Sequence, residues 1–126
     1  MKLRIKGNSL RLRVSPSEMA RLLENGRIGE TIRFAPQEDA KLTYALEHAS
    51  IEQEISVRYR AQEVTVVLST ESARKWAEAE RVGVSGTFDV GHDRLALLVE
   101  KDFACLDGND VDNEDTFSNP NGGVIC

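Results

Sequence analysis

The chain has 126 residues, of which 40% are hydrophobic and 29% are charged. This balance is typical of one soluble globular domain with a single core and excludes a chain that is disordered throughout. No apolar run approaches the roughly 18 residues of a membrane span, and the opening residues alternate charge with aliphatic side chains, so we expect a cytoplasmic protein with no membrane partner. The net charge of −5 arises at the C-terminal end, because residues 1–101 carry +1 and residues 102–126 carry −6.

The first half of the chain predicts two strands, a short helix and two further strands. Alternating apolar and charged residues surround Gly7–Asn8, which is the pattern of a hairpin with a two-residue turn. Ser15, Pro16 and Glu18 then follow the order of an N-cap, a first-turn proline and a capping-box acid, so a helix begins there. Its expected buried stripe is Met19, Leu22 and Leu23. The strands are expected over residues 2–6, 9–14, 30–35 and 41–47.

The second half repeats this order. A hairpin is expected around Ala61 and Gln62, and a helix begins after Ser69 or Thr70. This second helix is expected to bury Ala73, Trp76 and Ala77. The strands of this half are expected over residues 55–60, 63–68, 84–89 and 94–100.

Residues 55–102 resemble residues 1–48 displaced by 54 positions, which indicates an internal duplication. At this offset Arg4 aligns with Arg58, Gly29 with Gly83 and Ile28 with Val82. Before the last strand the offset falls to 53, as a single deletion in the preceding loop predicts. We therefore expect one domain over residues 1–102, made of repeats 1–49 and 55–102, followed by an acidic, flexible tail over residues 103–126.

The predicted fold class is α+β, with a duplicated ββαββ unit. Short connections between sequential strands favour antiparallel pairing, and a twofold repeat of such a unit can close and so remove free sheet edges. The expected architecture is an eight-stranded, mainly antiparallel barrel or a strongly curved sheet with two short helices.

Positive charge on the opening hairpin is the main chemical signal in the chain. Five bases and no acid lie within the first 13 residues, and their alternation places all five on one face. Arginine contacts phosphate through two parallel hydrogen bonds, so such a face can surround a phosphate-rich or other anionic small molecule. The alternative is a solvated face whose bases pair with glutamates on neighbouring strands. The residues predicted to bind the anion are Arg4, Lys6, Arg11, Arg13, Arg33 and Arg58.

Other motifs are weaker. The acidic tail lacks the glycine and the final glutamate of a calcium-binding loop. We hypothesise instead that the tail folds back over the basic hairpin as an internal ligand. The sequence contains no phosphate-binding glycine loop, nucleophile elbow or metal-spaced histidine pair, so it assigns no enzyme class and no cofactor. Aromatic residues do not interleave with the hairpin bases, which argues against nucleic acid as a partner. We expect the two cysteines, Cys105 and Cys126, to be reduced; a disulfide that fixes the tail is the alternative.

Residues 2–13 read KLRIKGNSLRLR, and residues 98–106 read LVEKDFACL, followed by an acidic stretch and Asn119–Pro120. The whole chain thereby resembles an uncharacterised bacterial family of short proteins with this opening and this close. The resemblance implies no activity. It does make Glu100 and Lys101, with Asp102 and Phe103, candidates for a site shared with the opening hairpin.

The order of elements also resembles that of the CYTH-like triphosphate tunnel proteins, whose barrel is a duplicated unit with a charged channel. This resemblance would imply binding or hydrolysis of a triphosphate with a divalent metal. The first strand of that family carries Glu-x-Glu-x-Lys, whereas this chain has Lys2, Arg4 and Lys6, so only the lysine carries over. Two hypotheses follow: a binder of an anionic small molecule, and a structural or interaction module that meets a partner or a second copy.

Overall fold

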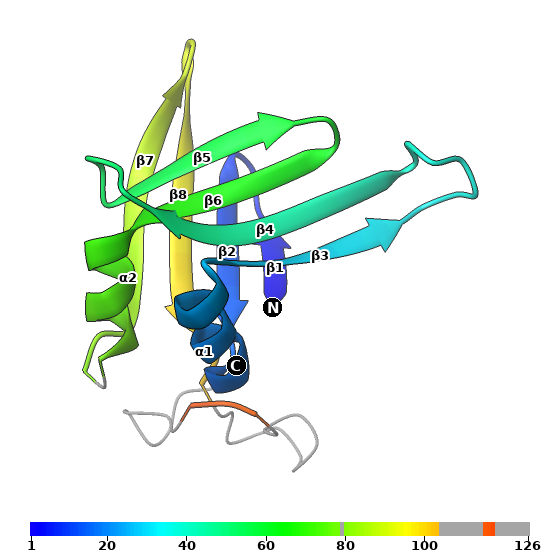
Figure 1. The fold of residues 1–126 in the computed structure, drawn as a ribbon. Coiled ribbons are helices and arrows are strands. Elements are labelled where there is room, and N and C mark those ends of the chain that lie inside the picture. The colour runs from blue at the N-terminus through cyan, green and yellow to red at the C-terminus, as the bar shows by residue number, and fades with distance from the viewer. Residues whose placement is uncertain (79, 104–114, 118–126) are drawn as a thin grey trace.

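The computed structural model describes residues 1–78, 80–103 and 115–117. Within these residues it contains two helices and eight strands, in the order that the sequence predicts (Figure 1). The predicted boundaries agree with the observed ones to within three residues. In chain order the elements are β1 (Lys2–Ile5), β2 (Ser9–Val14), α1 (Pro16–Asn25), β3 (Arg27–Arg33), β4 (Lys41–Ala49), β5 (Ile55–Arg60), β6 (Glu63–Ser69), α2 (Thr70–Ala77), β7 (Gly83–Val90) and β8 (Asp93–Lys101).

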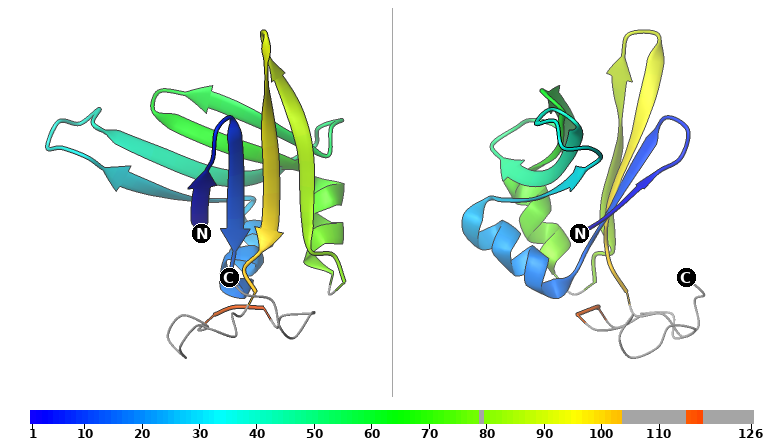
Figure 2. Two further views of the ribbon diagram at one scale, coloured as in Figure 1. Left: turned by 180° about the vertical axis from the view of Figure 1, so that it is seen from behind. Right: turned by 90° about the vertical axis from the view of Figure 1, so that its right-hand side faces the viewer.

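The strands form two separate four-stranded sheets. Sheet A has the order β1-β2-β8-β7, and sheet B has the order β3-β4-β6-β5. In each sheet two antiparallel hairpins are joined at the centre by a parallel pair, β2 with β8 and β4 with β6. The strands of the two sheets run across one another, and both helices lie at the same end of the molecule (Figures 1 and 2). α1 packs against β3 and β4, whereas α2 packs against β4, β6 and β7.

The predictions of a closed barrel and of one curved sheet are therefore wrong. They assumed that consecutive hairpins pair with each other, but β2 pairs with the last strand of the chain instead of with β3. α1 follows β2 directly and takes the chain from sheet A to sheet B, and α2 returns it to sheet A. Within the described residues each sheet thus keeps two unpaired edges, and the helices cover part of the sheets' inner faces.

The two halves of the chain contribute equivalent elements, and each sheet takes one hairpin from each half. One detail of the predicted alignment is wrong. Ile28 pairs with Leu46, and Val84 pairs with Val99. Because Leu46 and Val99 occupy equivalent places beside β6 and β2, the counterpart of Ile28 is Val84 and not Val82. Burial agrees, since Ile28 and Val84 are 8% and 1% exposed and Val82 is 46% exposed.

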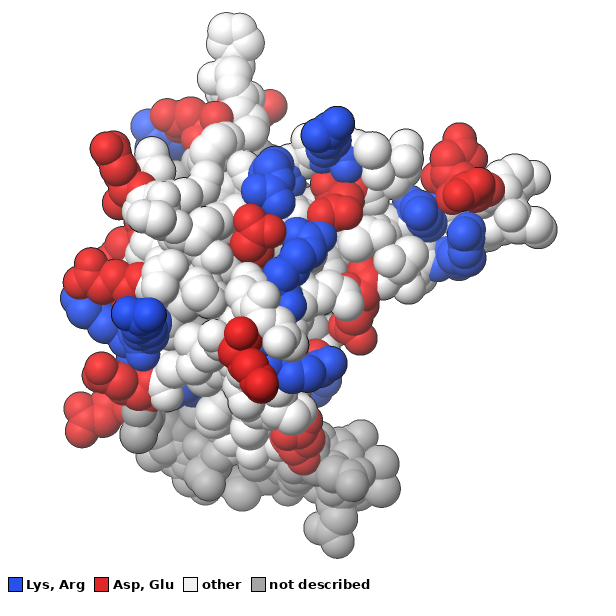
Figure 3. Space-filling view, in the orientation of Figure 1, with Lys and Arg blue, Asp and Glu red and all other residues white. Residues whose placement is uncertain are grey.

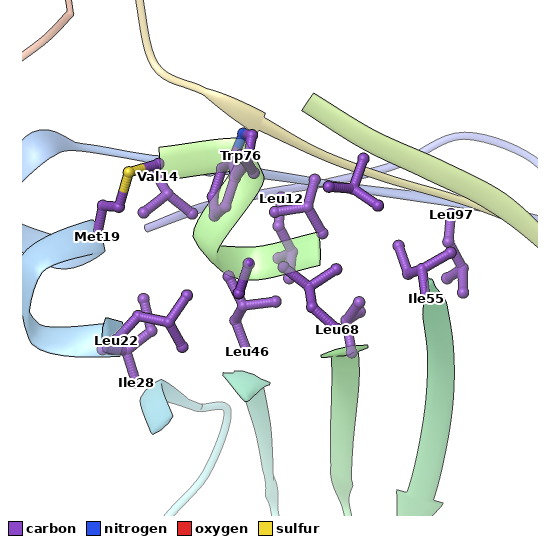
Figure 4. Close-up of a cluster of buried hydrophobic side chains, with 14 residues drawn as sticks. Leu12, Val14, Met19, Leu22, Ile28, Leu46, Ile55, Leu68, Trp76 and Leu97 are labelled. Atoms are coloured by element: carbon purple, nitrogen blue, oxygen red, sulfur yellow. The ribbon is translucent and has the colours of Figure 1, made fainter. Parts of the chain in front are cut away.

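One hydrophobic core fills the space between the sheets and the helices (Figure 4). The predicted helix stripes largely occupy it, but Leu23 is 39% exposed, which corrects its expected burial. Trp76 is fully buried, and its indole nitrogen donates a hydrogen bond of 3.0 Å to the carbonyl of Val82. Such a bond satisfies the one polar atom of the ring, so the side chain can fill the core. Other core residues include Leu12, Val14, Leu22, Leu46, Leu68, Leu97 and Val99.

Turn chemistry differs between the two equivalent hairpins. In the β1–β2 turn, Gly7 has φ +55°, and the side chain of Asn8 donates a 2.7 Å hydrogen bond to the carbonyl of Arg94. In the β5–β6 turn, Ala61 and Gln62 have φ values of +48° and +62°. Two consecutive positive φ angles define a type I′ turn, in which residues other than glycine and asparagine are strained.

Candidate anion-binding site

The outer face of the β1–β2 hairpin carries a cluster of bases. The strand register places Lys2 directly opposite Arg13 and Arg4 directly opposite Arg11. We call these four residues the basic face. Lys6, at the start of the turn, follows the same alternation and extends it. Side chains opposite each other in an antiparallel pair have Cβ atoms about 5 Å apart, so like charges in these positions are unfavourable unless an anion lies between them.

Two acids on β8 and just after it neutralise part of the basic face. The Oε1 atom of Glu100 lies 2.8 Å from the Nε atom of Arg13 and 3.3 Å from the Nε atom of Arg11. Asp102 lies 2.9 Å from the amino group of Lys2. The carboxylate of Glu100 thus forms an ion pair with each of two guanidinium groups through a single nitrogen atom of each. Both guanidinium groups keep other N–H donors that can bind a further acceptor.

Arg4 and Lys6 differ from these three bases. Both side chains are exposed, and within the described part of the chain neither forms an ion pair. Arg4 lies between the exposed edge of sheet A and Arg11, whose partner is already shared with Arg13. The basic face therefore retains positive charge that its own acids do not neutralise.

On the equivalent face of sheet B, two of the bases are paired with glutamates, while Arg33, Lys41 and Arg60 share the face by register. Glu47 accepts two hydrogen bonds from Arg58, of 3.1 and 3.2 Å, and one of 3.0 Å from Arg27. Arg27 also pairs with Glu63, which accepts a 3.2 Å hydrogen bond from the hydroxyl of the buried Thr65. Two arginines and two glutamates thus form a closed network. On this side of the molecule bases and acids are interspersed (Figure 3).

The network shifts the titration of its carboxylates. Hydrogen bonds from Arg58 and from Arg27 outweigh burial and lower the pKa of Glu47 below its ordinary value. The hydrogen bond from Arg27 likewise lowers the pKa of Glu63. Both acids are therefore ionised whenever the protein is near neutral pH, and their bases are occupied.

The structure brings together only some of the predicted ligand residues. Arg4, Arg11, Arg13 and Glu100 share the outer face of sheet A, with Lys6 beside them. Arg58 lies on sheet B, where Glu47 holds it. Arg33 ends β3 on the same sheet and donates a 3.3 Å hydrogen bond to the carbonyl of Gln37. A single site that uses the bases of both sheets is therefore incompatible with the fold.

Lys101 faces the interior and not the basic face. It is 3% exposed, and its amino group donates a 2.6 Å hydrogen bond to the carbonyl of Glu78, the residue that ends α2. The amino group also lies 5.3 Å from the ring centroid of Phe117. Burial lowers the pKa of Lys101. A lysine in this position stabilises the end of a helix, where carbonyl groups lack partners and the dipole is negative.

Four residues of the predicted tail are described, Phe103 and residues 115–117, and they lie against the body. Asp115 accepts a 2.5 Å hydrogen bond from the hydroxyl of Ser17, in the first turn of α1, and this bond lowers its pKa. Phe117 packs edge-on against Phe103, with ring centroids 6.2 Å apart. These contacts lie beside α1 and the end of β8. The rest of the predicted tail, with Cys105 and Cys126, lies outside the described residues.

Sequence reasoning missed the role of Arg27 in the sheet B network. Its position directly after the helix-ending Gly26 gave no sign that it belongs to β3. The register that brings Arg27 opposite Glu47 was the missing information, because that pair lies 20 residues apart in the chain.

Further features of the described residues bear on the kind of protein this is. No helix there is long and apolar enough to cross a membrane. The same residues contain no group of three or more His, Cys, Asp or Glu side chains arranged to hold a metal. An open pocket of about 350 Å³ adjoins the sheet B network and is lined in part by Arg58, Arg60 and Glu63.

These features define a small α+β protein with two crossed sheets, a basic face on sheet A and an Arg–Glu network on sheet B. The chain belongs to the DUF7009 family, a family of unknown function, whose model matches residues 1–121. This match confirms the expected membership of an uncharacterised family. No curated protein and no solved structure matches the chain. The resemblance to CYTH-like tunnel proteins is not supported, because the two sheets remain separate and form no closed barrel.

Proposed function

We propose that the basic face binds a multiply charged anionic small molecule, of the phosphate-rich kind. The observation that carries the proposal is Arg4, which lies directly opposite Arg11 and forms no ion pair among the described residues. A phosphate group that bridges the two would relieve the like-charge contact and could accept two hydrogen bonds from each guanidinium. Glu100 would keep Arg11 and Arg13 oriented before the anion arrives.

We also propose that the two outer faces are diverged copies of one ancestral face. Arg4 and Arg58 occupy equivalent positions on β1 and β5, and Glu100 and Glu47 do so on β8 and β4. On sheet B the arginine pairs with the glutamate. On sheet A the glutamate pairs with Arg11 and Arg13 of β2, and within the described part of the chain Arg4 has no acidic partner.

This equivalence supplies a matched pair of variants, Arg4→Ala and Arg58→Ala. Each removes one positive charge from the same position of a β-hairpin. We expect triphosphate to raise the melting temperature of the wild-type protein, because a ligand that binds only the folded state stabilises it. Arg4→Ala should lose at least half of that increase. Arg58→Ala should retain it, although its melting temperature without ligand should be lower because Glu47 loses a bidentate partner.

The measurement is a thermal-shift titration with phosphate, pyrophosphate and triphosphate at two salt concentrations. Increments that grow with the charge of the ligand and shrink with salt are expected of this site. An equal loss in both variants would show that the anion responds only to net charge, and the proposal would then be wrong. Absence of any increment in the wild-type protein would also refute it.

A further inference from the structure

Within the described residues, the edge of sheet A formed by β1 has unpaired backbone groups and an apolar surface beneath it, and neither belongs to the small-anion site. Strand β1 pairs with β2 on one side only. Lys6 and Ser9 exchange both backbone hydrogen bonds at the turn, of 3.2 and 3.1 Å. Hydrogen bonding alternates along an antiparallel pair, so the backbone N–H and C=O groups of Arg4 and Lys2 also point toward β2. The backbone N–H and C=O groups of Leu3 and Ile5 point away from it. Among the described residues nothing pairs with that edge.

Sheet B extends beyond this edge. Seen from behind, the β3–β4 hairpin and the β5–β6 turn pass underneath β1 and project past it (Figure 2, left). The start of β1 lies over the side chains of Glu30 and Tyr44, which face each other across β3 and β4, because Met1 contacts both. We call such a set of opposed residues a row. The next row outward on the same face pairs Ile32 with Leu42. It is two residues further along the strands, about 7 Å, and so lies outward of the position about 4.8 Å from β1 that an added strand would take.

The projecting surface is apolar and exposed. We define the ledge as Ile32, Phe34 and Leu42, together with Tyr59, which lies on β5 in the row of Glu30 and Tyr44. Ile32, Phe34 and Tyr59 are 48%, 68% and 70% exposed, and Ile5, on the face of β1 turned toward sheet B, is 61% exposed. Lysine and arginine on an edge strand discourage unwanted pairing, but that protection does not account for exposed aromatic and aliphatic groups underneath the edge.

We infer that the β1 edge and the ledge together accept an added β-strand from a partner protein whose residues alternate between acidic and apolar. Strand addition satisfies the outward groups of Leu3 and Ile5, and side chains that point inward cover the ledge. Side chains that point outward lie beside Lys2 and Arg4, where acids are favoured. Charge complementarity argues against a second copy of this chain, since antiparallel pairing of two β1 strands sets bases against bases.

The test uses a fluorescent acetylated peptide that alternates glutamate with valine over six residues. Its controls are a peptide of the same composition with three glutamates followed by three valines, and a peptide that alternates lysine with valine. Binding is measured by anisotropy on the full-length protein. We expect the alternating acidic peptide to bind at least tenfold more tightly than either control. Equal affinity for the two acidic peptides would reduce the interaction to net charge and overturn the inference.

Two variants of one residue separate the backbone contact from side-chain effects. Ile5→Pro removes an outward N–H without breaking a bond to β2, and proline is tolerated at such edge positions. We expect it to weaken peptide binding at least tenfold, whereas Ile5→Ala should change binding less than threefold. Tyr59→Ser should also weaken binding. Circular dichroism and the melting temperature confirm that each variant is folded, and similar binding by the Pro and Ala variants would overturn the inference.

The inference does not rest on the proposed small-anion site, and the same variants distinguish the two. Ile5→Pro should leave the response to triphosphate unchanged. Failure of the strand-addition inference can therefore be distinguished from failure of the small-anion proposal. A dimer in sedimentation that Ile5→Pro abolishes would assign the edge to a second copy. Peptide binding seen only after the acids of residues 107–114 are replaced by amides would assign it to the chain's own tail. Either result would overturn the inference.

Discussion

Two glycines that align in the sequence are expected to respond in opposite ways to alanine. Gly83 begins β7 opposite Glu100, and a Cβ atom there would lie 2.6 Å from the backbone carbonyl of Val99. Gly29 lies in β3 opposite Ala45, and its Cβ would lie 3.3 Å from the Cβ of that residue. The first contact involves backbone and cannot be relieved by a side chain alone.

The magnitudes follow from these distances. Overpacking of a well-packed site costs about 1–3 kcal/mol, and replacing glycine within a strand gains about 0.5–1 kcal/mol. Gly83→Ala should therefore destabilise the protein by about 1–2 kcal/mol. Gly29→Ala should change the free energy of unfolding by less than about 0.5 kcal/mol, because its tightest contact is with a side chain and needs only a small shift.

Urea unfolding, followed by fluorescence of the single, buried Trp76, measures both variants on one scale. One kcal/mol corresponds to about 3–6 °C in melting temperature for a domain of this size, so thermal unfolding gives a second reading. Equal effects at Gly29 and Gly83 would refute the reasoning that the close approach to the Val99 carbonyl sets the cost at Gly83.

The remaining predictions concern a turn and a titration. Replacing Ala61 and Gln62 together by Asn-Gly should stabilise the protein by about 1 kcal/mol, because both positions have positive φ; unchanged or lower stability in urea unfolding would contradict this. Glu47→Gln should lower stability at pH 7. The pKa of Glu47 is lower in the folded protein, so its contribution is present above the ordinary carboxyl pKa of about 4.3 and is lost as the pH falls further. The difference between wild type and variant should therefore shrink at pH 3, and a difference that stays constant from pH 7 to pH 3 would show that ionisation of Glu47 is not involved.

Local signals in the sequence were sufficient for the elements but not for their arrangement. The capping box of Ser15 and Glu18 is present as predicted, with the hydroxyl and carboxylate each bonded to the other residue's backbone. The alternation around Gly7 likewise placed the bases on one face, as the register of β1 and β2 confirms for Lys2, Arg4, Arg11 and Arg13. These signals depend on residues only a few positions apart.

Long-range pairing carried no comparable signal. The parallel contact of β2 with β8 brings Arg13 beside Glu100, 87 residues away, and no local pattern indicates whether a strand will pair with its neighbour or with a distant one. The same ambiguity hid the burial of Lys101, whose charge suggested the outer face although it alternates in phase with the buried Leu97 and Val99. Continuing the alternation of buried residues from Leu97 and Val99 to Lys101, without regard to its charge, would have predicted its burial correctly.

The exchange of hairpins between the two halves has a consequence for biosynthesis. Sheet B is complete once Ser69 has been made, because β5 and β6 follow β3 and β4 directly. The opening hairpin must wait for β8, the last strand to leave the ribosome, before its second edge is paired. During most of translation the nascent chain therefore exposes the unpaired edge of β2. The hairpin that contains this edge carries five positive charges, which are exposed to whatever surrounds the ribosomal exit.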